Sequence, residues 1–131
     1  MSEIVSVMVR QPGLVVADIA PLLTDAGTVT ESGRGLYLEG PDGHVWIDPA
    51  DAVTEESWAE NPFAALGIAP SECSFFSVVY RFAAVELMVR AVAALNARLE
   101  IVVDTDFGEV IPGAEFTVER HLRAVGRSCG D

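Results

Sequence analysis

The feature that most constrains this fold is a pair of short alternating runs on either side of a tight turn. The runs are Leu36-Tyr37-Leu38-Glu39 and His44-Val45-Trp46-Ile47, and Gly40-Pro41-Asp42-Gly43 separates them. Tight turns favour glycine, proline and aspartate, and a period of two is typical of strands with one buried face. The sequence therefore predicts a β-hairpin whose core face carries Leu36, Leu38, Val45 and Ile47.

Three further segments have the pattern of strands. Residues 4–10 alternate, with valines at positions 5, 7 and 9 on one face and Ser6 and Arg10 on the other. Residues 75–80 are apolar on both faces, which is typical of a strand in the middle of a sheet. Residues 99–103 form another apolar run that ends at Asp104. These segments add a half-buried strand, a central strand and a late strand to the hairpin.

Three segments have the pattern of helices. Residues 14–26 form the first, with Asp18 as a cap, Pro21 in the first turn and Gly27 as the C-terminal stop. Residues 82–98 form the second, and its inward positions by spacing are Val85, Met88, Val89, Val92 and Leu95 or Asn96. Residues 114–125 form the third, with Val118, Leu122 and Val125 inward and Arg120, His121 and Arg123 near its C-terminal end. Residues 49–72 are predicted to be a loop with helical turns, one of them over residues 54–58.

The order of elements predicts the fold class. It runs strand, helix, strand, strand, loop, strand, helix, strand, helix. The strand–helix units together with one hairpin indicate an α+β fold, in which a small mixed β-sheet carries packed helices as a single layered sandwich. A length of 131 residues with no linker or repeat fits one domain over residues 1–131.

The chain is strongly acidic, and its charge is unevenly distributed. It carries 20 acidic residues against 8 basic ones, all of them arginine, for a net charge of −12. Residues 1–72 hold 12 acids and two arginines, a net of −10, whereas residues 73–131 hold eight acids and six arginines, a net of −2. Such a field disfavours nucleic acids and anionic membranes and attracts basic partners. The alternative is that the acidity serves only solubility.

The expected location is the cytoplasm. The N-terminal residues lack the positive region of a signal peptide, and no stretch approaches 18 uninterrupted apolar residues. Cys73 and Cys129 are too few for a disulfide framework, and two unbonded thiols suit a reducing compartment, although a bridge between them is the alternative.

The sequence contains no residue set that is typical of an active site. Asp104, Asp106 and Glu109 follow a predicted strand, where carboxylates can hold a divalent cation, but a strand-ending turn is the favoured interpretation. His44 and His121 are the only histidines, and each is expected at the surface or partly packed. Their spacing to other residues suggests neither a metal site nor a Cys–His nucleophile. We therefore expect no enzymatic activity, no metal and no cofactor.

Acidic and aromatic residues around the hairpin make the best candidate for a binding surface. Tyr37 and Trp46 would point away from the predicted core face into a field of carboxylates. Aromatic side chains often dominate the energy of protein interfaces, and carboxylates steer a basic partner. The alternative is that a helix covers this face and that both aromatics are core residues. The candidate residues are Tyr37, Glu39, Asp42, His44, Trp46, Asp48, Asp51, Glu55, Glu56 and Trp58.

Two segments carry a family resemblance. One is the strand-and-turn stretch of residues 101–111 followed by Phe116 in the closing helix, and the other is Glu56-Ser57-Trp58 leading to Pro62-Phe63. With its length and acidity, the chain resembles the immunity proteins of bacterial polymorphic-toxin systems in general style, without matching a particular family. The resemblance implies a monomeric inhibitor that occludes a cognate toxin domain, often a basic nuclease, by stoichiometric binding.

Three functions therefore remain open from the sequence. The favoured one is an immunity protein that neutralises a toxin with a basic surface. The second is a domain that binds a small molecule or a divalent metal through Asp104, Asp106 and Glu109. The third is a structural or assembly subunit whose exposed aromatics mediate self-association.

Overall fold

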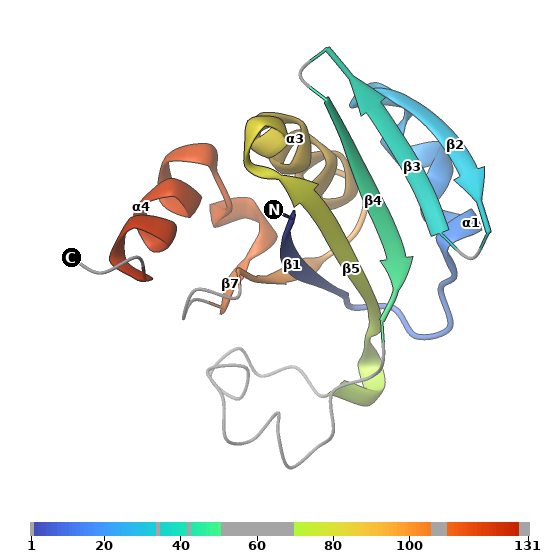
Figure 1. Ribbon diagram of the computed structural model, residues 1–131. Helices are drawn as coiled ribbons and strands as arrows, with labels where there is room; N and C mark the ends of the chain where they lie inside the picture. The colour runs from blue at the N-terminus through green and yellow to red at the C-terminus, as the bar shows by residue number, and fades with distance from the viewer. Residues whose placement is uncertain (1, 34, 42, 51–69, 106–109, 129–131) are drawn as a thin grey trace.

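The strands form a single β-sheet (Figure 1), and their alternating apolar residues line one face of it. The computed structural model describes residues 2–33, 35–41, 43–50, 70–105 and 110–128. Within them, seven strands pair in the order β2-β3-β4-β5-β1-β6-β7, and all neighbours are antiparallel. The strands are β1 (Ser2–Val9), β2 (Thr28–Ser32), β3 (Gly35–Gly40), β4 (Gly43–Pro49), β5 (Ser74–Arg81), β6 (Ile101–Asp104) and β7 (Val110–Pro112).

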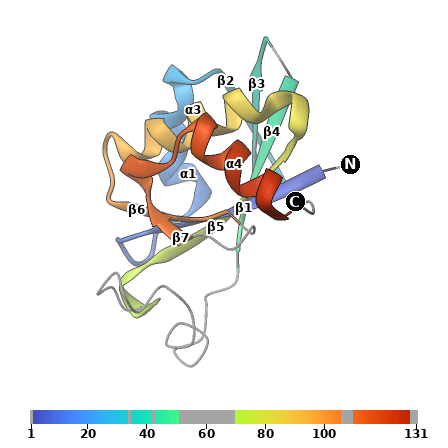
Figure 2. The same cartoon turned by 90° about the vertical axis from the view of Figure 1, so that its left-hand side faces the viewer.

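The helices α1 (Val16–Ile19), α3 (Val85–Asn96) and α4 (Val118–Ser128) lie on the same side of the sheet (Figure 2). A 3-10 segment, Ala20–Asp25, extends α1. The core fills the space between this helical layer and the sheet, because alternate strand residues turn their apolar side chains toward the helices. Its fully buried members include Val5, Val7, Ile19, Leu23, Leu36, Leu38, Val45, Ile47, Val78, Leu87, Met88 and Leu95.

The α+β class is confirmed, but the sheet is antiparallel where a mixed sheet was expected. β5 and β6 are joined through α3, as the strand–helix–strand pattern predicts. The two strands do not pair with each other, because β1 lies between them and pairs antiparallel to both. The crossover is therefore real, while the parallel pairing that usually accompanies it is replaced by two antiparallel ladders.

The predicted hairpin and central strand are confirmed. β3 pairs with β4 over Leu36 to Gly40, and Gly43 closes the turn with a φ of +136°, which favours glycine. β5 lies between β4 and β1. The edge strands β2 and β7 were not predicted. β2 has one half-buried residue, Val29, and otherwise exposed ones, so it lacks the apolar alternation that identifies a strand.

The first helix differs from its prediction in length and type. The α-helical part ends at Ile19, and the chain continues as the 3-10 segment Ala20–Asp25. Pro21 lies in this segment, and its missing N–H interrupts the α-helical hydrogen bonds. Asp18 is not the N-cap as predicted, because Val15 holds that position; Asp18 lies in the first turn of α1, where its carboxylate accepts a hydrogen bond from the Val15 N–H at 2.9 Å. The chain leaves this segment at Gly27, as predicted, and enters β2.

The two later helices are rotated relative to their predicted faces. In α3 the buried set is Leu87, Met88, Ala91, Val92 and Leu95, whereas Val85 and Val89 are only half-buried. In α4, Leu122 is 39% exposed and His121 is fully buried, the reverse of the predicted arrangement. α3 carries more apolar positions than one face holds, so spacing alone did not decide its orientation. In α4 the burial of His121 goes with its contacts to Tyr80 and Phe116. The helix predicted over residues 54–58 lies outside the described residues.

Candidate functional site

The face of the sheet opposite the helices carries a row of apolar side chains from four strands. The register pairs Tyr37 of β3 with Trp46 of β4, Trp46 with Val79 of β5, and Val79 with Ile4 of β1. Neighbouring strands are about 4.8 Å apart, so the row extends about 14 Å across the sheet. Trp46 is 38% exposed and Ile4 is 45% exposed. We call this face the open face and these four residues the apolar row.

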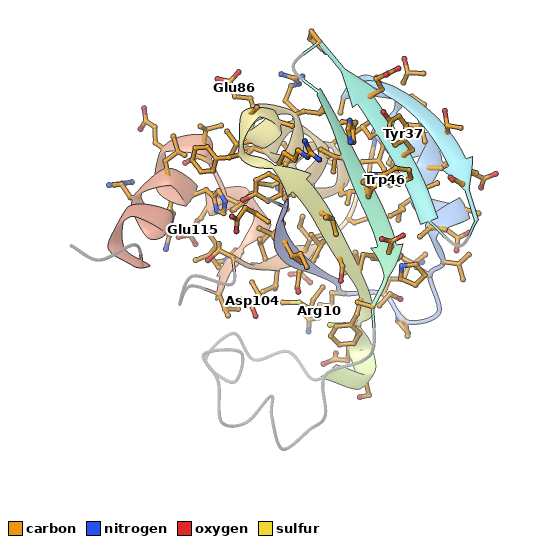
Figure 3. All side chains as sticks on the ribbon, viewed as in Figure 1. Arg10, Tyr37, Trp46, Glu86, Asp104 and Glu115 are labelled. Carbon is orange, nitrogen blue, oxygen red and sulfur yellow. The ribbon has the colours of Figure 1, made fainter. Side chains whose placement is uncertain are left out.

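An aromatic cluster forms the β3–β4 end of the apolar row. Figure 3 shows Tyr37 and Trp46 side by side on the two strands, and their ring centroids are 4.6 Å apart at an interplanar angle of 61°. The His44 ring stacks on Tyr37 with a centroid distance of 5.1 Å and lies 6.2 Å from Trp46. Such edge-to-face and stacked contacts hold the rings in a defined arrangement. The cluster therefore presents rings that are already ordered before any partner arrives.

Polar and charged side chains border the apolar row on both sides. On one side Glu39 is paired with His44, and Arg81 follows on β5. On the other side Asp48 is paired with Ser77, Ser77 with Ser6, and Ser6 with Asp104. One border therefore mixes both charge signs, whereas the other combines carboxylates with hydroxyl groups.

The Asp48 carboxylate is positioned by the glycine opposite it. Gly35 has no side chain, and the carboxylate of Asp48 occupies the space that a Cβ of residue 35 would need. The ion pairs that the described residues form join Arg10 to Glu72 and Glu100, and Arg120 to Glu115. Neither Glu39 nor Asp48 takes part in these pairs. Among the described residues, neither carboxylate therefore has an ion-pair partner that an incoming cation would have to displace.

The cavity next to the aromatic cluster is small. It has a volume of about 110 Å³ and is lined by His44, Trp46, Val79, Tyr80 and Arg81. Sites for small organic ligands are usually about 300 Å³ or more.

A second cavity has a volume of about 350 Å³ and mainly apolar walls. It lies beside the start of α1, the end of β4 and the start of β5. Its one polar side chain, Ser74, donates to the Gln11 carbonyl and accepts from the Leu14 N–H. The Ser74 hydroxyl therefore holds the segment that precedes α1 against β5, and both of its hydrogen bonds are made within the protein.

The structure brings half of the predicted binding residues together. Tyr37, Glu39, His44, Trp46 and Asp48 share the open face, so the expectation that the aromatics point away from the core is confirmed, and the helices of the described chain lie on the other face. The remaining predicted residues lie outside the described part of the chain: Asp42, Asp51, Glu55, Glu56 and Trp58.

Sequence reasoning missed the contributions of β1 and β5 to this face. Ile4, Ser77, Val79 and Arg81 are far from the hairpin in sequence and reach it only through strand pairing. A signal was present in residues 75–80, since a central strand must present alternate residues to both faces.

The alternative metal site could be placed only in part. Asp104 ends β6 on the open face, whereas Asp106 and Glu109 lie outside the described residues. Within the described ranges, no three His, Cys, Asp or Glu side chains are grouped so that they could hold a metal ion.

His121 is not the surface or partly packed residue that the sequence predicted. It is fully buried, and its Nε2 shares a hydrogen bond of 2.5 Å with the hydroxyl of Tyr80, which is 2% exposed. Phe116 packs edge-on against the His121 ring at 5.4 Å. Burial, with a smaller contribution from the charge of Glu3, raises the pKa of Tyr80 to about 12. This pair joins α4 to β5 and is part of the core.

Cys73 does not have the surroundings of a catalytic thiol. It packs with Met8 and Val102 in a small apolar cluster on the open-face side of the sheet, whereas His121 lies on the helical side. Burial, followed by the charge of Glu72, raises the pKa of the Cys73 thiol, which disfavours the reactive thiolate. Cys129 lies outside the described residues, so the pairing of the two cysteines stays a prediction.

No family model, curated protein or solved structure matches this chain. Among the described residues, none of the helices combines the length and the apolar character that crossing a membrane requires.

Proposed function

We propose that the protein binds another protein through its open face and acts as an immunity protein. In this proposal it neutralises a bacterial toxin that has a basic surface by covering the toxin's active or substrate-binding surface in the cytoplasm. Such inhibition is stoichiometric and needs surface complementarity, not a reacting group. The observation that carries the binding role is the ordered pair of the half-buried Tyr37 and the exposed Trp46 on a sheet face that the described helices leave uncovered.

The chemistry of the open face supports a protein partner. Tryptophan and tyrosine are enriched among the few residues that dominate binding energy, because they bury a large area at a small cost in conformational entropy. The apolar row continues from these rings to Val79 and Ile4, so a partner could exclude water over four strands. Carboxylates at the border, Glu39 and Asp48, would fix the orientation of a basic surface.

The charge of the whole chain supports a basic partner. With a net charge of −12, the protein attracts cationic surfaces over long range and repels nucleic acids and anionic membranes. A nuclease domain that binds nucleic acid through arginines and lysines has the complementary charge. The resemblance of the chain to immunity proteins supports the toxin as the partner class.

The experiment is a growth-rescue assay with the proteins encoded beside this one. Each protein encoded beside this chain is induced alone and together with it, and growth is compared. For any such protein that inhibits growth, the stoichiometry of its complex with this chain is measured by light scattering and the Kd by calorimetry. We expect rescue, a one-to-one complex, and a Kd raised about 30-fold by Trp46→Ala, because loss of a hot-spot side chain costs about 2 kcal/mol or more.

Glu86→Gln provides the matched control, since Glu86 is an exposed residue of α3 on the helical side (Figure 3). It should leave the Kd close to that of the wild type. Failure to rescue growth from any neighbouring toxin would count against the immunity role. An unchanged Kd in a folded Trp46→Ala protein would show that the open face is not the contact surface.

A further inference from the structure

The open face has the chemistry to hold one particular side chain of its partner. Resting on the proposed function, we propose that the patch of Trp46, Tyr37, Asp48 and Ser77 is a seat for an arginine side chain that the basic partner presents. We call these four residues the arginine seat. In it, the guanidinium group packs on the Trp46 ring and donates hydrogen bonds to the Asp48 carboxylate and the Ser77 hydroxyl.

The strand register places the required groups within reach of one guanidinium. Trp46 and Asp48 are two residues apart on β4, so they share the open face at a spacing of about 6.6 Å. Ser77 is paired with Asp48 across to β5. A cation is attracted to a tryptophan ring within about 6 Å of the ring centroid. A planar group placed between the ring and the carboxylate therefore meets both.

The residues around the arginine seat hold the Asp48 carboxylate and the Trp46 ring in positions that suit a cation. The Asp48 side chain lies over Gly35, whose missing Cβ makes room for the carboxylate next to the strand. Asp48 is absent from the ion pairs that the described residues form with one another, so an incoming cation displaces no partner among those residues. Tyr37 supports the Trp46 ring edge-on at 4.6 Å and keeps it ordered on the sheet.

The chemistry of the patch favours arginine over lysine. Arginine offers a planar group with five N–H donors that can stack on a ring while it bonds a carboxylate, and it is more weakly hydrated than an ammonium group. The other border of the apolar row does not offer the same chemistry, because Arg81 lies beside His44 there. The seat is therefore on the Asp48 side of Trp46.

The test uses the full chain and a defined probe, N-acetyl-arginine methylamide. Its binding is followed by ¹H–¹⁵N NMR through the indole N–H of Trp46, which is distinguished from that of Trp58 by a Trp58→Phe variant. The lysine analogue and the uncharged citrulline analogue are titrated in parallel. We expect a saturable shift centred on Trp46, Asp48 and Ser77 with arginine, a weaker response with lysine, and no saturable shift with citrulline.

Two variants test the named contacts. Trp46→Leu should weaken arginine binding about two- to fivefold through loss of the cation–π contact. Asp48→Asn should weaken it about two- to fivefold as well, while Glu86→Gln, which changes an exposed carboxylate on the helical side, should not. Asp48→Asn keeps the shape of the side chain, so it tests the seat even if Trp46→Leu perturbs the sheet.

The outcomes separate the arginine seat from the proposed function. If arginine produces no saturable shift at Trp46 up to tens of millimolar, or if Asp48→Asn binds it as the wild type does, the seat is refuted. A toxin complex that still depends on Trp46 would in that case leave the proposed function standing. Conversely, saturable arginine binding in a chain that rescues growth from no neighbouring toxin would support the seat and refute the immunity role.

Discussion

The buried hydrogen bond between Tyr80 and His121 should stabilise the fold in a manner that depends on pH. The substitution Tyr80→Phe removes only the hydroxyl group, and it leaves the His121 Nε2 without that partner in a site from which water is excluded. Removal of one partner of a buried hydrogen bond costs about 1–3 kcal/mol. At pH 7 we therefore expect the variant to unfold more easily by about that amount, as measured by urea denaturation followed by circular dichroism.

The pH dependence follows from the raised pKa of Tyr80. The folded protein holds its phenol at a pKa of about 12, whereas an unfolded tyrosine titrates near pH 10. Between these values the folded chain binds more protons, so stability must fall as the pH rises. The stabilisation is complete below pH 10 and is lost as the pH passes through about 12, and a shift of about two units corresponds to about 2.7 kcal/mol.

Wild-type protein should accordingly lose about half of that free energy, roughly 1.4 kcal/mol, by pH 11, and Tyr80→Phe should not. The difference in stability between the two proteins should then shrink between pH 9 and pH 11. Tyr37→Phe serves as a control at pH 7, because Tyr37 lies on the open face, and it should cost under about 0.5 kcal/mol. A Tyr80→Phe protein with wild-type stability at pH 7 and the same loss at high pH would refute this reasoning.

Two further predictions concern packing, and both are read from thermal melts. Gly35→Ala should destabilise the protein by about 1–3 kcal/mol, because the new Cβ would lie 2.7 Å from the Ile47 carbonyl oxygen and would displace the Asp48 carboxylate; a melting temperature within about 1 °C of wild type would contradict this. Leu95→Ala in α3 should cost about 2–5 kcal/mol because the side chain is 1% exposed, whereas Leu122→Ala in α4 should cost under about 1 kcal/mol. Equal costs would mean that α4 is oriented as its sequence spacing predicted.

The hairpin, the central strand and the outward direction of Tyr37 and Trp46 could be predicted because they depend on local patterns. A period of two on each side of a tight turn specifies both the pairing and the face of every residue in it. The edge strand β2 escaped prediction because an edge strand with a solvated face has little apolar signal. The burial of His121 escaped it because its hydrogen-bond partner, Tyr80, is 41 residues away in sequence.

The candidate site was predictable only where it is local. Tyr37, Glu39, His44, Trp46 and Asp48 lie on consecutive strands joined by one turn, so their common face follows from alternation. Val79, Ser77 and Ile4 join them through the pairing of β5 with β4 and with β1, which no local pattern encodes. The alternative that a helix covers this face was a question of tertiary packing, and the position of α1, α3 and α4 on the other face answers it for the described residues.

The amino-acid sequence by itself determined the α+β class, the hairpin and the acidity of the first half of the chain. Each of these is set by residue type or by spacing within a dozen residues. Only the tertiary structure decided that β1 separates β5 from β6, that His121 is buried against Tyr80, and that the described helices all lie on one face of the sheet. The physical reason is that these features depend on which distant segments pack together. The burial of apolar surface is non-directional, so local periodicity indicates which face is buried but not which distant segment covers it.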